Sequence, residues 1–351
     1  MRPAQLAEIL DYEFVAASAG QHTPVMLWGP PGVGKSQIVA QIAARHAAQV
    51  IDVRLSQMEP SDLRGIPFRV EQHGKSAVEW AAPSLLPDAL RHGASGVLFL
   101  DEITSAPPSV SAAAYQLILD RRLGDYRVPE GWAIVAAGNR QGDRGVSYAM
   151  PSPLANRFSH YEVEADLEDW VAWAYANAID PRLVGFLRFK PDLLFDFDPS
   201  RSGAAFPSPR SWEFADRALQ KFGARPDLLP GALIACVGQA AGIEFAAYLE
   251  SLAQLPDLDL IVAGGLADVP QAVDLQYAVA AALAGRALRA RGSPEAALVW
   301  GRILDYAGRL PLREMGVMLV ADLHRGIGPE LFALPQFSAW AGAVADLLLY
   351  E

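Results

Sequence analysis

Cysteine and long apolar runs are both scarce in this chain. One cysteine, Cys236, occurs in 351 residues, so the chain can form neither an internal disulfide nor a cysteine-based zinc site. The longest uncharged apolar run, residues 228–243, contains Pro230 and several glycines and is too short and too broken for a membrane-spanning helix. No cationic leader precedes an apolar core, which predicts no signal peptide. We therefore expect a cytoplasmic protein that does not enter membranes.

Positive charge is also scarce, since 29 Lys and Arg stand against 40 Asp and Glu and the formal net charge is −11. Such a surface disfavours nucleic acid and anionic membranes as general partners, although a local basic channel remains compatible with it. The six histidines do not have the spacing of metal ligands. The chain is long and 52% hydrophobic, which predicts a large core and two or more domains.

Residues 29–36 read Gly-Pro-Pro-Gly-Val-Gly-Lys-Ser, which is the G-x-x-x-x-G-K-S pattern of a phosphate loop. A short apolar strand is expected before it and an amphipathic helix after it, as this motif requires. The Lys35 ammonium can reach the β- and γ-phosphates, and the Ser36 hydroxyl can ligate Mg²⁺. The sequence therefore predicts ATP and Mg²⁺ as cofactors. The predicted cofactor-binding residues are Gly29, Pro30, Pro31, Gly32, Val33, Gly34, Lys35, Ser36 and Gln37.

A second motif, Val97 to Leu100 followed by Asp101 and Glu102, reads as a buried strand that ends in two carboxylates. Beside a phosphate loop, this is the Walker B pattern. Asp101 is then expected to hold the metal together with Ser36, and Glu102 to polarise the attacking water. The alternative is an ordinary acidic turn after a strand.

The pattern of the chain changes near residue 165. Before that point short apolar runs alternate with helical patterns, which predicts an α/β fold with a parallel sheet. After it helical patterns dominate. We expect an α/β nucleotide-binding core over residues 1–165, an all-α lid over 166–255 and extra C-terminal helices over 256–351. The expected strands are 25–28, 50–54, 97–100, 133–137 and 160–163, and the expected later helices are 166–178, 181–190, 211–222, 231–253, 272–290, 294–309 and 312–325.

Three further motifs follow in order: Gly138-Asn139-Arg140 at a strand end, Pro153 to Phe158, and Pro207 to Arg210 at a helix start. Over residues ~1–255 this series resembles an AAA+ ATPase, whose P-loop core has a parallel five-stranded sheet. The resemblance implies Asn139 at sensor 1, Arg157 as an arginine finger and Arg210 at sensor 2, so that the implied catalytic residues are Glu102, Asn139, Arg157 and Arg210. Arg144 is a competing finger, and Arg210 is compatible with action in cis or in trans.

Within AAA+ proteins the chain looks most like the MoxR-like group. Residues 61–80 read as a hairpin in the position of the helix-2 insert, and residues 121–128 read as the pre-sensor 1 hairpin. One departure is Gly-Asn-Arg at 138–140, where many relatives have Gln-Asn-Pro; the polar sensor is retained. The resemblance implies a homo-oligomeric ring, expected to be a hexamer, that acts as a chaperone or activator of a client protein. In this group the client often carries a von Willebrand factor A domain.

Two other functions remain open at this point. A nucleic-acid-stimulated motor would show ATP hydrolysis that rises with DNA or RNA, and insert-bearing relatives include such motors. A nucleotide-gated scaffold would show little turnover, against which the intact Glu102 and Asn139 argue. In the C-terminal part, Ser293-Pro294-Glu295 predicts a capped helix start. Phe332, Phe337, Trp340 and residues 347–350 are expected to pack on their own domain.

Overall fold

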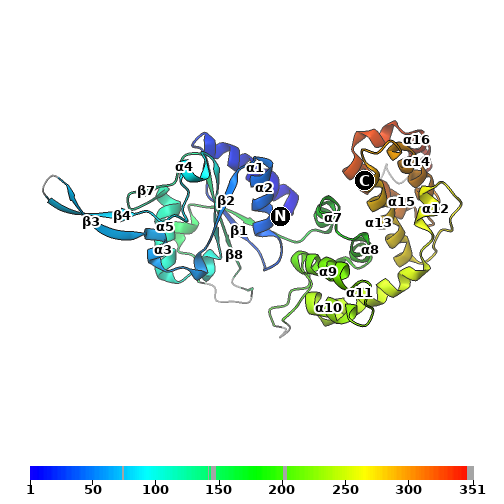
Figure 1. Cartoon of the computed structure of the whole chain (residues 1–351), viewed down its shortest axis with the longest axis horizontal. Helices are drawn as coiled ribbons and strands as arrows, with labels where there is room; N and C mark the ends of the chain where they lie inside the picture. The colour runs from blue at the N-terminus through cyan, green and yellow to red at the C-terminus, as the bar shows by residue number, and fades with distance from the viewer. Residues whose placement is uncertain (73–74, 141, 144–147, 201–203, 346–351) are drawn as a thin grey trace. The chain divides into compact units, whose positions relative to one another are not determined.

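The computed structural model describes residues 1–72, 75–140, 142–143, 148–200 and 204–345. They form two compact units, residues 1–165 and 166–351, and Figure 1 labels secondary-structure elements of both. None of the helices in the described ranges is both long and apolar enough to cross a membrane. The cytoplasmic location stays a prediction.

A five-stranded sheet forms the centre of the first unit, with the order β2-β5-β8-β1-β9. All neighbouring pairs are parallel, so the α/β fold with a parallel five-stranded sheet is confirmed. The central strands β5 and β8 are apolar on both faces because helices cover both sides of the sheet. The strands are β1 Val25–Trp28, β2 Gln49–Arg54, β5 Gly96–Asp101, β8 Trp132–Gly138 and β9 Ser159–Glu162.

Helices pack on both faces of this sheet. On one face Phe14 of α1 and Ile42 of α2 share a core with Val97 of β5. On the other face Leu117 of α5 shares a core with Leu98 of β5. The alternation of Val97 and Leu98 sends neighbouring side chains to opposite cores, as a strand buried on both faces requires. The helices of this unit are α1 Pro3–Ser18, α2 Lys35–Arg45, α3 Pro60–Arg64, α4 Ala89–His92, α5 Pro108–Asp120 and α6 Ser152–Ala155, with 3-10 helices η1 Leu55–Gln57 and η2 Ile103–Ser105.

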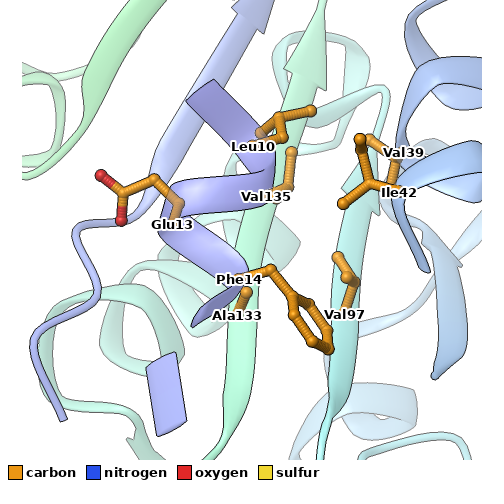
Figure 2. Close-up of a pocket in the computed structure, with 8 residues that line it drawn as sticks. All are labelled: Leu10, Glu13, Phe14, Val39, Ile42, Val97, Ala133 and Val135. Atoms are coloured by element: carbon orange, nitrogen blue, oxygen red, sulfur yellow. The ribbon is translucent and has the colours of Figure 1, made fainter. Parts of the chain in front are cut away.

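A small gap remains between α1, α2 and the sheet. Figure 2 shows Leu10 and Phe14 of α1 facing Ile42 of α2 across it. The Glu13 side chain points away from these residues and accepts a hydrogen bond from the backbone N–H of Thr23 at 3.0 Å. The cavity measures about 10 Å³, which is room for one water molecule at most. It is a packing gap in the core and offers no ligand site.

Two hairpins project from the first unit, as predicted. The longer one pairs β3 Ile66–Gln72 with β4 Lys75–Ala81 and extends away from the sheet (Figure 1). The shorter one pairs β6 Arg122–Leu123 with β7 Tyr126–Arg127. The prediction was wrong for residues 61–64, which form the end of α3 because Glu59 and Asp62 make a reciprocal capping box.

The second unit is helical throughout its described residues. Its helices are α7 Leu167–Ala176, α8 Pro181–Phe189, α9 Pro209–Phe222, α10 Leu229–Val237, α11 Gln239–Ser251, α12 Leu258–Val262, α13 Val273–Ala290, α14 Ala296–Ala307, α15 Arg313–Ile327 and α16 Pro335–Ala343, with 3-10 helices η3 Pro191–Leu194, η4 Leu252–Gln254 and η5 Pro329–Ala333. Trp340 is buried in the core of this unit, as predicted, whereas residues 347–350 lie outside the described ranges.

Two details of the second unit differ from prediction. The single helix expected over 231–253 is broken at Gly238, which has φ +86° and would bring an added Cβ within 2.8 Å of the Ala205 carbonyl oxygen. The expected cap at Ser293 is also absent, since α14 begins at Ala296 after Glu295. The boundary between lid and extension at residue 255 stays a prediction.

A buried ion cluster joins α7, α8 and α15 within the second unit. The Arg188 guanidinium donates to Glu168 Oε1 at 2.8 Å and to Asp322 Oδ1 at 2.6 Å. The Tyr175 hydroxyl donates to Asp322 Oδ2 at 3.2 Å. Burial raises the pKa of Asp322 to about 6 despite the opposing charge of Arg188. The positive charge of Arg188 therefore offsets the negative charges of two carboxylates, Glu168 and Asp322, from different helices.

Replacing Arg188 should destabilise the second unit more than replacing its carboxylate partner. Arg188→Met removes the buried cation and leaves Asp322 only the partly exposed Arg325, 3.5 Å away, which we expect to lower the free energy of unfolding by about 3–5 kcal/mol. Asp322→Asn keeps an acceptor for Arg188 and should cost about 1–2 kcal/mol. Denaturant unfolding of the full chain, followed by tryptophan fluorescence, measures both; equal losses would contradict this account.

Candidate functional site

The phosphate loop lies between β1 and the N-terminus of α2. Gly34 directly precedes α2 and has φ +106°, in the left-handed region that favours glycine. At Gly29 an added Cβ would lie 2.8 Å from the Val163 carbonyl oxygen, so the start of the loop passes too close to the chain after β9 for a larger residue. The backbone N–H groups at the start of α2 and the helix dipole make this end of the helix attractive to an anion.

The Lys35 ammonium lies inside the curve of this loop. Its Nζ donates to the Gly29 carbonyl oxygen at 2.5 Å and to the Pro30 carbonyl oxygen at 3.1 Å. It also lies 3.4 Å from Asn139 Oδ1, at the end of β8. The sequence separates Lys35 and Asn139 by about a hundred residues, and the sheet brings their side chains into contact.

Two oxygen-bearing side chains meet at the start of α2. The Ser36 hydroxyl donates to Asp101 Oδ2 at 3.3 Å, which brings together the two residues predicted as metal ligands. Asp101 Oδ1 accepts from the Glu102 backbone N–H at 2.9 Å. Within the described residues no group of three or more His, Cys, Asp or Glu has the arrangement of a complete metal site. A hard cation held by Ser36 and Asp101 would therefore take its remaining oxygen ligands from phosphate and water, as Mg²⁺ usually does.

Glu102 adopts a backbone conformation that is uncommon for its type. Its φ of +56° and ψ of +33° lie in the left-handed region. The Ser56 hydroxyl, in η1 after β2, donates a hydrogen bond to Glu102 Oε2. Burial, and then the nearby charge of Asp101 on β5, raise the pKa of Asp52 on β2. Three carboxylates thus crowd the ends of β2 and β5, an arrangement that a cation would relieve.

Sequence reasoning missed Ser56, Asp52 and Thr104 as members of this site. Thr104 is buried, and its hydroxyl oxygen accepts from the Asn139 backbone N–H at 3.3 Å. An added Cβ at Gly138 would lie 2.8 Å from the Thr104 side chain, so Thr104 fills the space beside the end of β8. The sequence signal for these residues is weak, because their roles depend on which strands are neighbours.

Of the three arginines considered as catalytic residues, only Arg157 is described in the same unit as this cluster, and it lies away from it. Arg157 is exposed in the turn between α6 and β9, at the amino end of its strand, whereas the phosphate loop follows the carboxyl end of β1. Arg210 is exposed near the start of α9 in the second unit, which the structure describes separately from the first. Arg144 lies outside the described residues. Their roles stay predictions.

Comparison with known proteins agrees with this geometry. Residues 24–158 match the model of the AAA domain, dynein-related subfamily. Protein NorQ of Paracoccus denitrificans is 34% identical over 108 residues, which cover 30% of this chain and 37% of that protein. The chain contains a MoxR-like AAA+ domain. The resemblance seen in its motifs is thereby confirmed.

Two other similar proteins are both RuvB proteins. The Holliday junction branch migration complex subunit RuvB 1 of Synechococcus sp. is 26% identical over 173 residues, covering 45% of this chain and 38% of that protein. A solved structure of a RuvB mutant from Thermotoga maritima matches with a TM-score of 0.39 at 16% identity, over 72% of this chain and 76% of that one. The chain thus spans little more than a third of the curated relatives' length.

The Thr104 hydroxyl should matter because it holds the backbone of Asn139. Thr104→Val keeps the shape of the side chain but leaves the Asn139 N–H without its partner, which should lower the free energy of unfolding by about 1–3 kcal/mol. Thr104→Ser keeps the hydroxyl and is the matched control, with a smaller loss. Denaturant unfolding compares the two; a Val variant as stable as the Ser variant would contradict the assignment.

Proposed function

We propose that this MoxR-like AAA+ protein hydrolyses ATP and couples hydrolysis to the remodelling of a client protein. The observation that carries the proposal is the convergence of Lys35, the Ser36–Asp101 pair and Asn139 at the carboxyl ends of three neighbouring strands. A phosphate-binding loop, a pair of metal-binding oxygens and a polar sensor are the parts that phosphoryl transfer to water requires. Membership of the AAA+ family supports the same activity.

The binding role falls to the loop. Residues 29–36 would surround the phosphates with backbone N–H groups, and Lys35 would exchange its contacts with the Gly29 and Pro30 carbonyls for phosphate oxygens. Ser36 and Asp101 fit Mg²⁺, since both offer oxygen and lie within hydrogen-bonding distance. When bound, the ion would neutralise charge on the β- and γ-phosphates.

The chemical step is assigned to Glu102 and Asn139. A Glu102 carboxylate can orient an attacking water and accept its proton, while the Asn139 amide can hydrogen-bond the γ-phosphate. The hydrogen bond from Ser56 holds the Glu102 carboxylate toward the end of β2. We assign Ser56 the role of fixing the orientation of this base.

Arg157 is proposed to act on the nucleotide of a neighbouring subunit. It lies at the opposite end of the sheet from the phosphate loop of its own chain, across a four-residue strand that spans about 13 Å. A charge at that distance cannot contact its own γ-phosphate, so an exposed arginine there suits a ring in which each subunit completes the next site. A hexameric ring is the expected assembly, with Arg210 as sensor 2.

The client is proposed to be a protein, in keeping with the MoxR-like domain, and a von Willebrand factor A domain is the first class to test. The similarity to a RuvB subunit makes a nucleic-acid-stimulated motor the second candidate, which the acidic balance of the chain disfavours. Stimulation of ATP hydrolysis by junction DNA, and not by protein, would favour that candidate. Negligible phosphate release under all conditions would favour a nucleotide-gated scaffold.

Variants of Lys35 and Glu102 should separate ATP binding from ATP hydrolysis. Lys35→Ala should abolish ATP binding, because Lys35 contacts the phosphates directly. Glu102→Gln should preserve binding and stop turnover, because it removes only the base that acts on water. Equilibrium titration with a fluorescent ATP analogue and a phosphate-release assay measure the two effects.

Lys35→Arg is a useful control in this experiment, since it keeps the charge but changes the point-like ammonium to a planar group. Equal loss of ATP affinity in Lys35→Ala and Glu102→Gln would refute the assignment of Glu102 as the base. The Glu102→Gln variant should also retain client together with ATP in a pull-down.

A further prediction concerns Arg157. Arg157→Ala should keep near-normal ATP affinity and lose about 10³-fold or more in hydrolysis, as arginine fingers do in related reactions. Mixing it with Lys35→Ala subunits should restore part of the activity, because interfaces then pair an intact loop with an intact finger. Recovery should rise with protein concentration.

Arg45→Ala is the matched control, since Arg45 is an exposed arginine in the last turn of α2, far from the loop. Wild-type turnover by Arg157→Ala in an assembled ring would transfer the finger to Arg144. No gain in verified mixed rings over either variant alone would remove support for a finger in trans.

A further inference from the structure

Trp28 and His160 join the phosphate loop to the turn that carries Arg157. Trp28 is the last residue of β1 and directly precedes Gly29. It pairs with Glu162 in the register of β1 and β9, yet its indole reaches back along the sheet to His160. The indole Nε1–H donates to His160 Nδ1 at 2.9 Å, and the two ring planes are nearly parallel, with their centroids 6.0 Å apart.

This contact fixes the tautomer of His160. An indole N–H can only donate, so Nδ1 of His160 must be the acceptor and the ring proton must be on Nε2. His160 Nε2 lies 2.8 Å from the Ala155 carbonyl oxygen and therefore donates to it. The hydrogen bonds run in one direction, from Trp28 through His160 to the last residue of α6.

The end of this relay is the turn of Arg157. Leu154 and Phe158 are both buried in the core under α5, and Arg157 is exposed between them. The Ala155 carbonyl also accepts from the Phe158 backbone N–H at 3.2 Å. His160 thus adds a side-chain hydrogen bond from the sheet to a turn that is otherwise held by its own backbone hydrogen bonds and by two apolar side chains.

We propose that Trp28 and His160 are positioning residues that hold the Arg157 turn in register with the phosphate loop of the same subunit. This inference rests on the proposed role of Arg157 as a finger in trans. The relay spans the sheet from the end that carries the loop toward the end that carries the finger. A subunit would then supply its neighbour with a finger whose position is set from its own nucleotide site.

The decisive variant is His160→Phe, which keeps an aromatic ring beside Trp28 and removes both hydrogen bonds. We expect kcat for ATP hydrolysis to fall about 10- to 100-fold, the range that misplacement of a reacting group by about 1 Å produces, while KM for ATP stays unchanged. The double variant Arg157→Ala/His160→Phe should be no slower than Arg157→Ala alone, because His160 acts only through the finger.

Mixed assemblies test the direction of the effect. Adding Lys35→Ala subunits, which carry an intact relay and finger, should rescue turnover by the intact loops of His160→Phe subunits. His160→Gln keeps a donor that can reach the Ala155 carbonyl and should stay within about threefold of the wild type. His92→Phe is the matched control, since His92 packs edge-on against Trp132 at the other end of β8, and its turnover should not change.

Trp28→Phe provides a second variant, which removes the indole N–H donor and keeps a smaller aromatic ring. It should lower kcat several-fold with the same rescue, and thermal unfolding of each variant reports whether the fold is retained. If Arg157→Ala is slow and His160→Phe and Trp28→Phe turn over like the wild type, this inference alone is overturned. It is also overturned if the His160→Phe loss persists in verified mixed assemblies, which would indicate damage to its own loop. Wild-type turnover by Arg157→Ala would overturn the finger and this inference together.

Discussion

The order of strands in the parallel sheet is the constraint on which the candidate site depends. Because β8 lies between β5 and β1, three segments far apart in sequence leave the sheet at one edge: the phosphate loop, the Asp101–Glu102 pair and Asn139. The segments are packed so closely here that a Cβ added at Gly138 would lie 2.8 Å from both Met26 and Thr104. The site therefore needs small residues as well as charged ones.

The charged side chains at this edge include the cations Lys35 and Arg54 and several carboxylates. Lys35 lies on the carbonyls of its own loop, while Asp101, Glu102 and Asp52 gather at the ends of β5 and β2. The raised pKa of Asp52 reflects this crowding as well as burial. A triphosphate alone would add to the negative charge, and a divalent cation between the phosphates and the carboxylates, as proposed above, would offset that repulsion. The Ser36–Asp101 pair is the place that the geometry offers for it.

Much of the fold and the centre of the site could be predicted from the sequence, because the signals are local. The phosphate loop and the apolar runs of all five strands are contiguous patterns, and the strands lie within one or two residues of their expected bounds. Ser56, Thr104 and His160 could not be found in this way, since their contacts depend on strand order and register. The break at Gly238 was missed because the apolar pattern continues across it; only the tertiary contact with Ala205 distinguishes the two helices.

The strand order also separates Arg157 from the phosphate loop of its own subunit. Arg157 precedes β9, and the phosphate loop follows the neighbouring parallel strand β1, so the two lie at opposite ends of these strands. One subunit therefore cannot bring Arg157 to its own Lys35. If Arg157 acts as the proposed finger, this separation would make assembly a condition of catalysis. It would also require rigidity between the two groups, since any movement of β9 would displace the finger. The indole of Trp28 and the ring of His160 lie across the two strands where this movement would arise. In the proposed assembly, the stiffness of this edge strand would affect catalysis at the neighbouring site together with the chemistry at the loop.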